Sequence, residues 1–260
     1  MIPVLGTAGG AVTAALAFLR ARPWLLLCGL GAYAVTAAIN FAVLPRWHLN
    51  GFIGQHVSGW AGELPGLILL IPVWTGLARF VILKDRTRGY FPLDVRVRRV
   101  LFATLVLSLL AMIGGLVFAG SLDAGARLQG RRSIAFALLA AAAVWKLVCW
   151  WLASRLAIAP ALGAAGARKD ALDTSFAYTQ GAVLGILMLK FVVYGPAFVA
   201  IAILFLLGRF VEFGPAAQFA SLIAITLITA ATELIDVAAM SLVAIRLVRL
   251  RTASAQPGPT

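Results

Sequence analysis

Residues 145–207 read WKLVCWWLASRLAIAPALGAAGARKDALDTSFAYTQGAVLGILMLKFVVYGPAFVAIAILFLL. One apolar run ends at Arg155, a polar segment occupies residues 167–180, and a second apolar run begins at Gly181. Each apolar run is long enough to cross a hydrocarbon core of about 30 Å as a helix. This stretch therefore predicts two membrane-spanning helices joined by a short elbow helix.

The composition extends this interpretation to the whole chain. Of its 260 residues, 62% are hydrophobic and 12% are charged, which leaves too little polar surface for a soluble protein of this length. The formal net charge is +13, but the basic residues form short clusters between apolar runs, as lipid headgroups and membrane topology require. The two cysteines lie inside apolar runs and indicate no disulfide. We expect lipid, and no nucleic acid, as the surroundings of this chain.

The same alternation of apolar runs and polar connectors continues on both sides of the opening stretch. It predicts an all-α fold, a polytopic membrane helix bundle with six transmembrane helices within residues 23–250. The spans are expected at residues 24–44, 64–83, 100–118, 133–152, 181–207 and 219–245.

The two ends of the chain differ from the spans. Residues 1–22 place apolar side chains on one helical face and end in Arg20 and Arg22, which predicts an amphipathic interfacial helix, with a weak additional span as the alternative. Residues 251–260 are expected to form a flexible cytoplasmic tail. With connectors on alternate sides, 14 Lys and Arg fall on the side of both termini and 5 on the other. The positive-inside rule therefore predicts both termini in the cytoplasm.

The most basic connector surrounds a Gly-Tyr-Phe-Pro turn between the second and third spans. Its arginines are expected to contact anionic lipid headgroups on the cytoplasmic side. These predicted headgroup ligands are Arg86, Arg88, Arg96, Arg98 and Arg99.

Five charged residues fall inside predicted spans. Arg79 lies near the end of its span, from where its side chain can reach the interface. The other four lie deeper: Lys146, Lys190, Glu233 and Asp236. An unpaired charge at the centre of a membrane is unfavourable by about 2.5 to 3.5 kcal/mol on insertion scales, so these side chains should face the bundle interior and meet there. Their distances from the nearest span ends place them at similar depth. They either neutralise one another and fix helix packing, or line a polar cavity for a charged solute, a headgroup or a proton relay.

Motifs for catalysis and metal binding are missing from the sequence. It has no Ser, His and Asp grouping and no His-Glu-x-x-His pattern. His48, His56 and Glu63 share one connector, but their spacings of eight and seven on a Gly-rich segment do not favour a metal site. We therefore expect no enzyme activity, no metal and no cofactor.

Residues 155–160 read RLAIAP and residues 171–181 read ALDTSFAYTQG. This pattern resembles the membrane domain attached to some bacterial glycerophosphoryl diester phosphodiesterases, and the stand-alone relatives of that domain. The family has an Arg-Leu helix end with a nearby Pro, then an Ala-Leu, an aromatic residue, a Thr and a Gly. This chain departs from it in carrying Phe176 where a Trp is usual, and it lacks the acidic residue that often follows the Pro. No polar stretch is long enough for the phosphodiesterase domain, so the resemblance implies no hydrolase activity.

The sequence thus predicts a non-enzymatic, multi-pass protein of the bacterial inner membrane that acts through lipid or protein contacts. Its expected partners are anionic lipids on the cytoplasmic side and another membrane protein. The alternative is a transporter or channel for a small charged solute that uses the four intramembrane charges.

Overall fold

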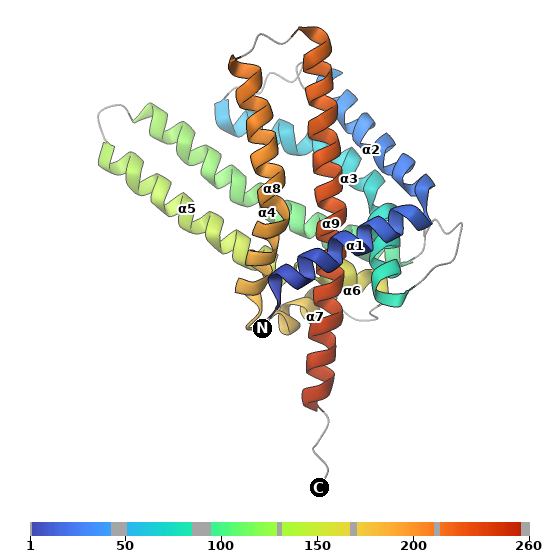
Figure 1. The fold of residues 1–260 in the computed structure, drawn as a ribbon. Helices are drawn as coiled ribbons and strands as arrows, with labels where there is room; N and C mark the ends of the chain where they lie inside the picture. The colour runs from blue at the N-terminus through green and yellow to red at the C-terminus, as the bar shows by residue number, and fades with distance from the viewer. Residues whose placement is uncertain are drawn as a thin grey trace.

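A computed structural model of the chain describes residues 2–42, 51–84, 95–128, 132–166, 171–210 and 214–255. Within these ranges the chain is helical apart from short turns (Figure 1). The helices are α1 (Val4–Ala21), α2 (Pro23–Ala42), α3 (Gly51–Leu83), α4 (Val95–Arg127), α5 (Arg132–Arg155), α6 (Ala159–Ala165), α7 (Ala171–Tyr178), α8 (Val183–Phe210) and α9 (Pro215–Ala255).

The predicted all-helical membrane bundle is confirmed. Among the described residues, 6 stretches are long and apolar enough to cross a membrane, and they lie in α1, α3, α4, α8 and α9 and across α5 and α6. The protein is therefore a multi-pass membrane protein. Helix α1 is among these stretches, and α2, the 20-residue apolar helix at the first predicted span, is described as apolar over Pro23–Thr36. Figure 1 shows α1 crossing α9 obliquely, and its predicted position at the membrane interface stays a prediction.

Helix α1 packs on the bundle through one face only. Ala11, Ala15 and Phe18 are buried, and the Phe18 ring meets that of Phe80 on α3 edge to face, with 5.7 Å between centroids. The opposite face exposes apolar side chains, with Leu5 77% exposed. This outer face has the composition of a surface that contacts lipid.

The helices α3, α4 and α9 extend furthest beyond the predicted spans. Residues 51–63, expected in a connector, form the first turns of α3, where the Trp60 indole donates a hydrogen bond of 2.8 Å to the Ser108 hydroxyl on α4. Neither Pro65 nor Pro72 ends α3, since neighbouring helices stabilise a membrane helix across the missing backbone bond. Helix α4 continues to Arg127, and α9 continues five residues into the predicted tail.

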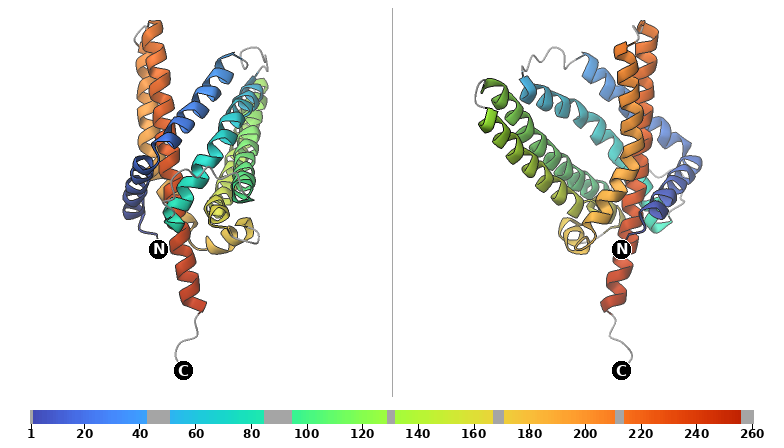
Figure 2. Two further views of the ribbon diagram at one scale, coloured as in Figure 1. Left: turned by 90° about the vertical axis from the view of Figure 1, so that its right-hand side faces the viewer. Right: turned by 60° about the vertical axis from the view of Figure 1, so that its left-hand side comes forward.

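The long helices form two pairs that meet at one end. Figures 1 and 2 show α4 and α5 side by side, and α8 and α9 side by side, with the two pairs diverging away from α6 and α7. Helix α3 packs against both α4 and α9. The short helices α6 and α7 therefore lie where the two pairs converge. They connect α5 to α8, one helix from each pair.

The elbow between α5 and α8 consists of α6 and α7, two short helices instead of the single one that was predicted. The hydroxyls of Ser175 and Thr179, both fully buried, donate hydrogen bonds of 2.9 and 2.8 Å to the Arg155 carbonyl oxygen. The Arg155 guanidinium lies 4.0 Å from the Phe176 ring centroid and donates a bond of 2.6 Å to the Phe176 carbonyl. These contacts cap the end of α5 and fix α7 against it.

We expect the double substitution Ser175→Ala and Thr179→Val to lower the free energy of unfolding by about 1 to 3 kcal/mol, because it strands the Arg155 carbonyl in a buried site. Thermal unfolding in detergent would measure this loss. Thr174→Val is the matched control, since the neighbouring Thr174 side chain is partly exposed. A double variant as stable as this control would show that the two hydroxyls do not hold α5.

Candidate functional site

Two of the predicted intramembrane charges form an ion pair. The Lys190 ammonium on α8 lies 3.0 Å from Asp236 Oδ2 and 3.4 Å from Oδ1 on α9. The pair is largely removed from the surface, with side-chain exposures of 33% for Lys190 and 15% for Asp236. A charge-assisted contact between facing helices thus joins α8 to α9 within their apolar spans.

Two tyrosines complete the polar contacts around the acids. The Tyr194 hydroxyl on α8 donates a hydrogen bond of 3.2 Å to Asp236 Oδ2, and the Lys190 ammonium lies 5.7 Å from the Tyr194 ring centroid. The Tyr33 hydroxyl on α2 donates a short hydrogen bond to Glu233 Oε2. Each carboxylate of α9 therefore accepts a tyrosine hydrogen bond from a different helix.

Lys146 has other neighbours. Its ammonium lies 4.8 Å from the Phe118 ring centroid and 6.0 Å from that of Trp150, which are cation–π distances. Glu233 is bonded to Tyr33, and the ion pair formed by the four charges is that of Lys190 with Asp236, so Lys146 does not meet the acids as expected. The sequence placed Lys146 at the same membrane depth as the other three charges, but it could not show the direction in which this side chain points around the axis of α5.

A cavity of about 680 Å³ lies beside the ion pair, between the two diverging helix pairs. Its charged wall comes from Lys190, Glu233 and Asp236. The other walls are mostly apolar and come from α3, α4, α5 and α6, with Trp74 and Trp150 among them. Its volume is within the usual range for small-molecule sites, and such sites combine apolar walls with a few polar groups.

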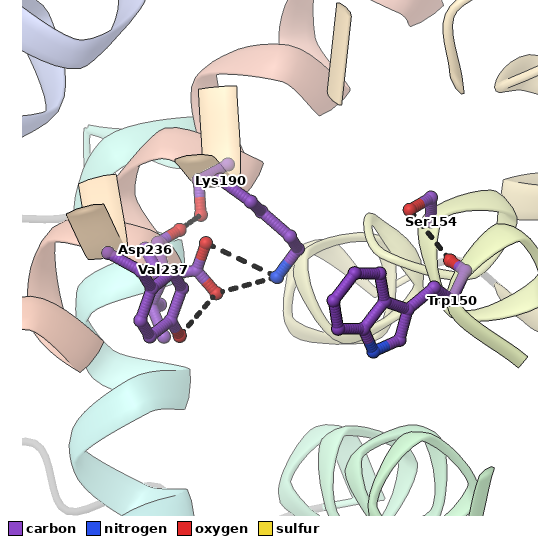
Figure 3. Close-up of polar contacts among 7 residues, drawn as sticks. Trp150, Ser154, Lys190, Asp236 and Val237 are labelled. Carbon is purple, nitrogen blue, oxygen red and sulfur yellow. Dashed lines mark hydrogen bonds and ion pairs between the residues drawn. The ribbon is translucent and has the colours of Figure 1, made fainter. Parts of the chain in front are cut away.

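Figure 3 shows how the charged groups face this cavity. The Lys190 side chain extends from α8 so that its ammonium lies between the Asp236 carboxylate and the Trp150 indole. Ser154 turns away to donate a hydrogen bond of 2.9 Å to the Trp150 carbonyl within α5. The polar groups presented to a ligand are therefore concentrated on α8 and α9.

The predicted headgroup arginines are only partly described. Arg86 and Arg88 lie outside the described residues. Arg96, Arg98 and Arg99 lie in the first turns of α4, with Arg98 exposed. Arg99 approaches α6, where a side-chain carbon on Gly163 would lie 3.3 Å from Arg99 Cβ. These three arginines thus lie at the end of the bundle where the elbow is found.

The described residues hold no group of three or more His, Cys, Asp or Glu side chains that could bind a metal ion. His48 lies outside these residues. His56 lies within α3, where its Nε2 is 3.2 Å from the Met112 carbonyl oxygen of α4. Its role in the described structure is a contact between these two helices.

Sequence reasoning missed the hydroxyl partners Tyr33 and Tyr194. A charged residue in a predicted span indicates that a polar partner lies nearby, whereas an uncharged tyrosine in a span gives no comparable indication. For Tyr194 a usable signal did exist, because it follows Lys190 by four residues and so shares its helix face. For Tyr33 the sequence gives no indication that α2 lies next to Glu233.

The resemblance noted above concerns the segment that the structure shows as the elbow, from Arg155 to Gly181. Its Arg, Ser, Thr and aromatic residues make the contacts that cap α5. Because no family model, no curated protein and no solved structure matches this chain, the relationship to the membrane domain of glycerophosphoryl diester phosphodiesterases stays a prediction.

Proposed function

We propose that this protein is a non-enzymatic membrane protein whose intramembrane cavity holds an amphipathic, lipid-like molecule. The observation that carries the proposal is the cavity of about 680 Å³, which is mostly apolar and has the Lys190 and Asp236 pair in one wall. A purely apolar ligand would make no hydrogen bonds with the ion pair. A fully hydrated ion would gain no polar contacts from the other walls, which are mostly apolar.

The polar wall defines the chemistry of the headgroup. Lys190 is a donor with three N–H groups, while Asp236 and Glu233 are acceptors with lone pairs beyond those that the tyrosines use. A group that both accepts and donates hydrogen bonds fits this wall, as a zwitterionic or hydroxyl-bearing headgroup does. The excess of acid over base at the wall disfavours a purely anionic headgroup.

The apolar walls suit the rest of such a molecule. Phe191 on α8 and Trp150 on α5 both line the cavity, and they are 76% and 55% exposed. Lining side chains this exposed mark an opening between α5 and α8. In a membrane this opening faces lipid, so an amphipathic ligand can enter from the bilayer.

We expect Ala153→Trp to abolish retention of an amphipathic ligand, because Ala153 lines the cavity and an indole there would fill it. Mass spectrometry of lipids extracted from the purified protein would measure retention. Ala143→Trp is the control, since Ala143 is an exposed residue of the same helix outside the cavity. Equal retention by the two variants would refute ligand binding in this cavity.

Transport of a small charged solute is the second candidate. It is favoured by the three charged side chains, Lys190, Glu233 and Asp236, that line one cavity. Solute uptake by reconstituted vesicles that disappears in the variant Lys190→Ala/Asp236→Ala would favour this candidate over the holding of a lipid-like molecule.

The proposed location is the bacterial inner membrane with both termini in the cytoplasm, which the excess of basic residues on that side supports. With Cys28 and Cys149 replaced, a cysteine at position 127 should react with an impermeant reagent outside the cell, and one at position 249 should not. Both positions are exposed, so access alone does not distinguish them. Labelling of position 249 from outside would contradict the proposed orientation and place the C-terminus outside the cytoplasm.

A further inference from the structure

A second groove, of about 640 Å³, lies at the elbow end of the bundle. It is bounded by the N-terminal segment at Ile2, the turn at Gln180, the first turns of α8 and the last part of α9. In Figure 1 these segments converge near the N-terminus, where α9 begins to protrude from the bundle. The groove is separate from the cavity that contains Lys190, since the two share no lining residue.

The charge of this groove is entirely positive among its described lining residues. Arg246 and Arg251 contribute two guanidinium groups, and Tyr178 and Gln180 add neutral polar groups. The described residues that line it include no Asp or Glu, in contrast to the acidic wall of the larger cavity. A wall that presents two guanidinium groups favours an anionic ligand, and phosphate oxygens match the fork of donors that Arg presents.

The apolar side of the groove continues along α8. Leu184 and Met188 line it and are 69% and 53% exposed. These two side chains are four residues apart, a spacing that keeps them on one helix face. A ligand bound at the arginines therefore has an exposed apolar track beside it, running into the span of α8.

We propose that this groove binds an anionic phospholipid. Its phosphate lies between Arg246 and Arg251, and its acyl chains follow Leu184 and Met188 along α8. The arginines select the anionic headgroup, and the apolar track selects a lipid over a soluble phosphate. Arg246 and Arg251 are not among the arginines that the sequence indicated as headgroup ligands. The proposal does not depend on the function of the larger cavity.

Native mass spectrometry of the full-length protein in detergent tests this site. The probes are dioleoyl phosphatidylglycerol, dioleoyl phosphatidylcholine and glycerol phosphate. We expect wild type to retain phosphatidylglycerol in preference to the other two. The variant Arg246→Gln/Arg251→Gln should weaken that binding about thirtyfold, since each cation near a membrane surface contributes about a factor of five.

The control Arg20→Gln/Arg249→Gln removes the same charge from exposed positions outside the groove and should bind as wild type does. Arg246→Gln alone keeps the 3.3 Å hydrogen bond from Arg251 to the Ala177 carbonyl. If the double variant does not fold, this single variant tests the site, and its affinity for phosphatidylglycerol should fall about fivefold. Equal loss in the control would overturn the site in favour of general charge attraction. Equal retention of phosphatidylcholine, or binding of glycerol phosphate as tight as that of the lipid, would also overturn it.

Discussion

Replacing Asp236 alone by asparagine is expected to lower the free energy of unfolding by about 3 to 5 kcal/mol, because it strands the Lys190 ammonium in a site of low dielectric. Lys190→Met should have a similar effect by stranding the carboxylate. The double variant removes both charges and should be more stable than either single variant. The physical basis is the 3.0 Å contact between two side chains that are only 33% and 15% exposed.

Thermal unfolding of the four proteins in detergent gives the coupling free energy of the pair. Lys146→Met is the matched control, because its ammonium faces the rings of Phe118 and Trp150 and strands no opposite charge. It should lose about 0.5 to 2 kcal/mol. Additive losses in the Lys190 and Asp236 cycle would mean that each charge is stabilised independently by water in the cavity, which would favour solute transport.

Gly66→Ala is expected to destabilise the protein by about 1 to 3 kcal/mol through overpacking. A side-chain carbon at this position of α3 would lie 1.8 Å from Thr36 Oγ1 and 3.0 Å from Thr36 Cβ on α2. Rotating the threonine hydroxyl relieves the first contact and leaves the second. The two helices would therefore have to move apart.

The sign of this effect is informative, because alanine in place of glycine inside a helix otherwise stabilises it by about 1 kcal/mol. Gly59 on the same helix has nothing within 4 Å of such a carbon, so Gly59→Ala should show that gain. Combining Gly66→Ala with Thr36→Ala should recover part of the loss. Equal midpoints of thermal unfolding for the Gly59 and Gly66 variants would show that α2 and α3 do not meet there.

Much of the fold followed from the length of apolar runs. A run of about 20 residues predicts a spanning helix wherever it occurs, because backbone groups in lipid must bond within their own segment. The same rule does not locate helix ends outside the apolar region. Hence α3 begins at Gly51 and α4 continues to Arg127, in segments that looked like connectors from composition alone.

The candidate site was predictable only in part. Charges in apolar runs marked Lys190 and Asp236 as residues that needed partners, and the structure brings these two together. Lys146 and Glu233 are also charges in apolar runs, but the Lys146 ammonium lies near the Phe118 ring and Glu233 accepts a hydrogen bond from Tyr33. Depth along a helix can be read from sequence, whereas the direction of a side chain around the axis depends on which helices pack beside it.

The divergence of the α4 and α5 pair from the α8 and α9 pair has a mechanical consequence. With 24 residues, α5 is about 36 Å long, and its end at Arg155 is held by the hydroxyls of Ser175 and Thr179. A lever of this length converts a rotation of about 10° at its base into a displacement of about 6 Å at its tip. The two hydroxyl contacts at Arg155 therefore lie at the end of α5 where a small change of angle has its largest effect on the position of the far end.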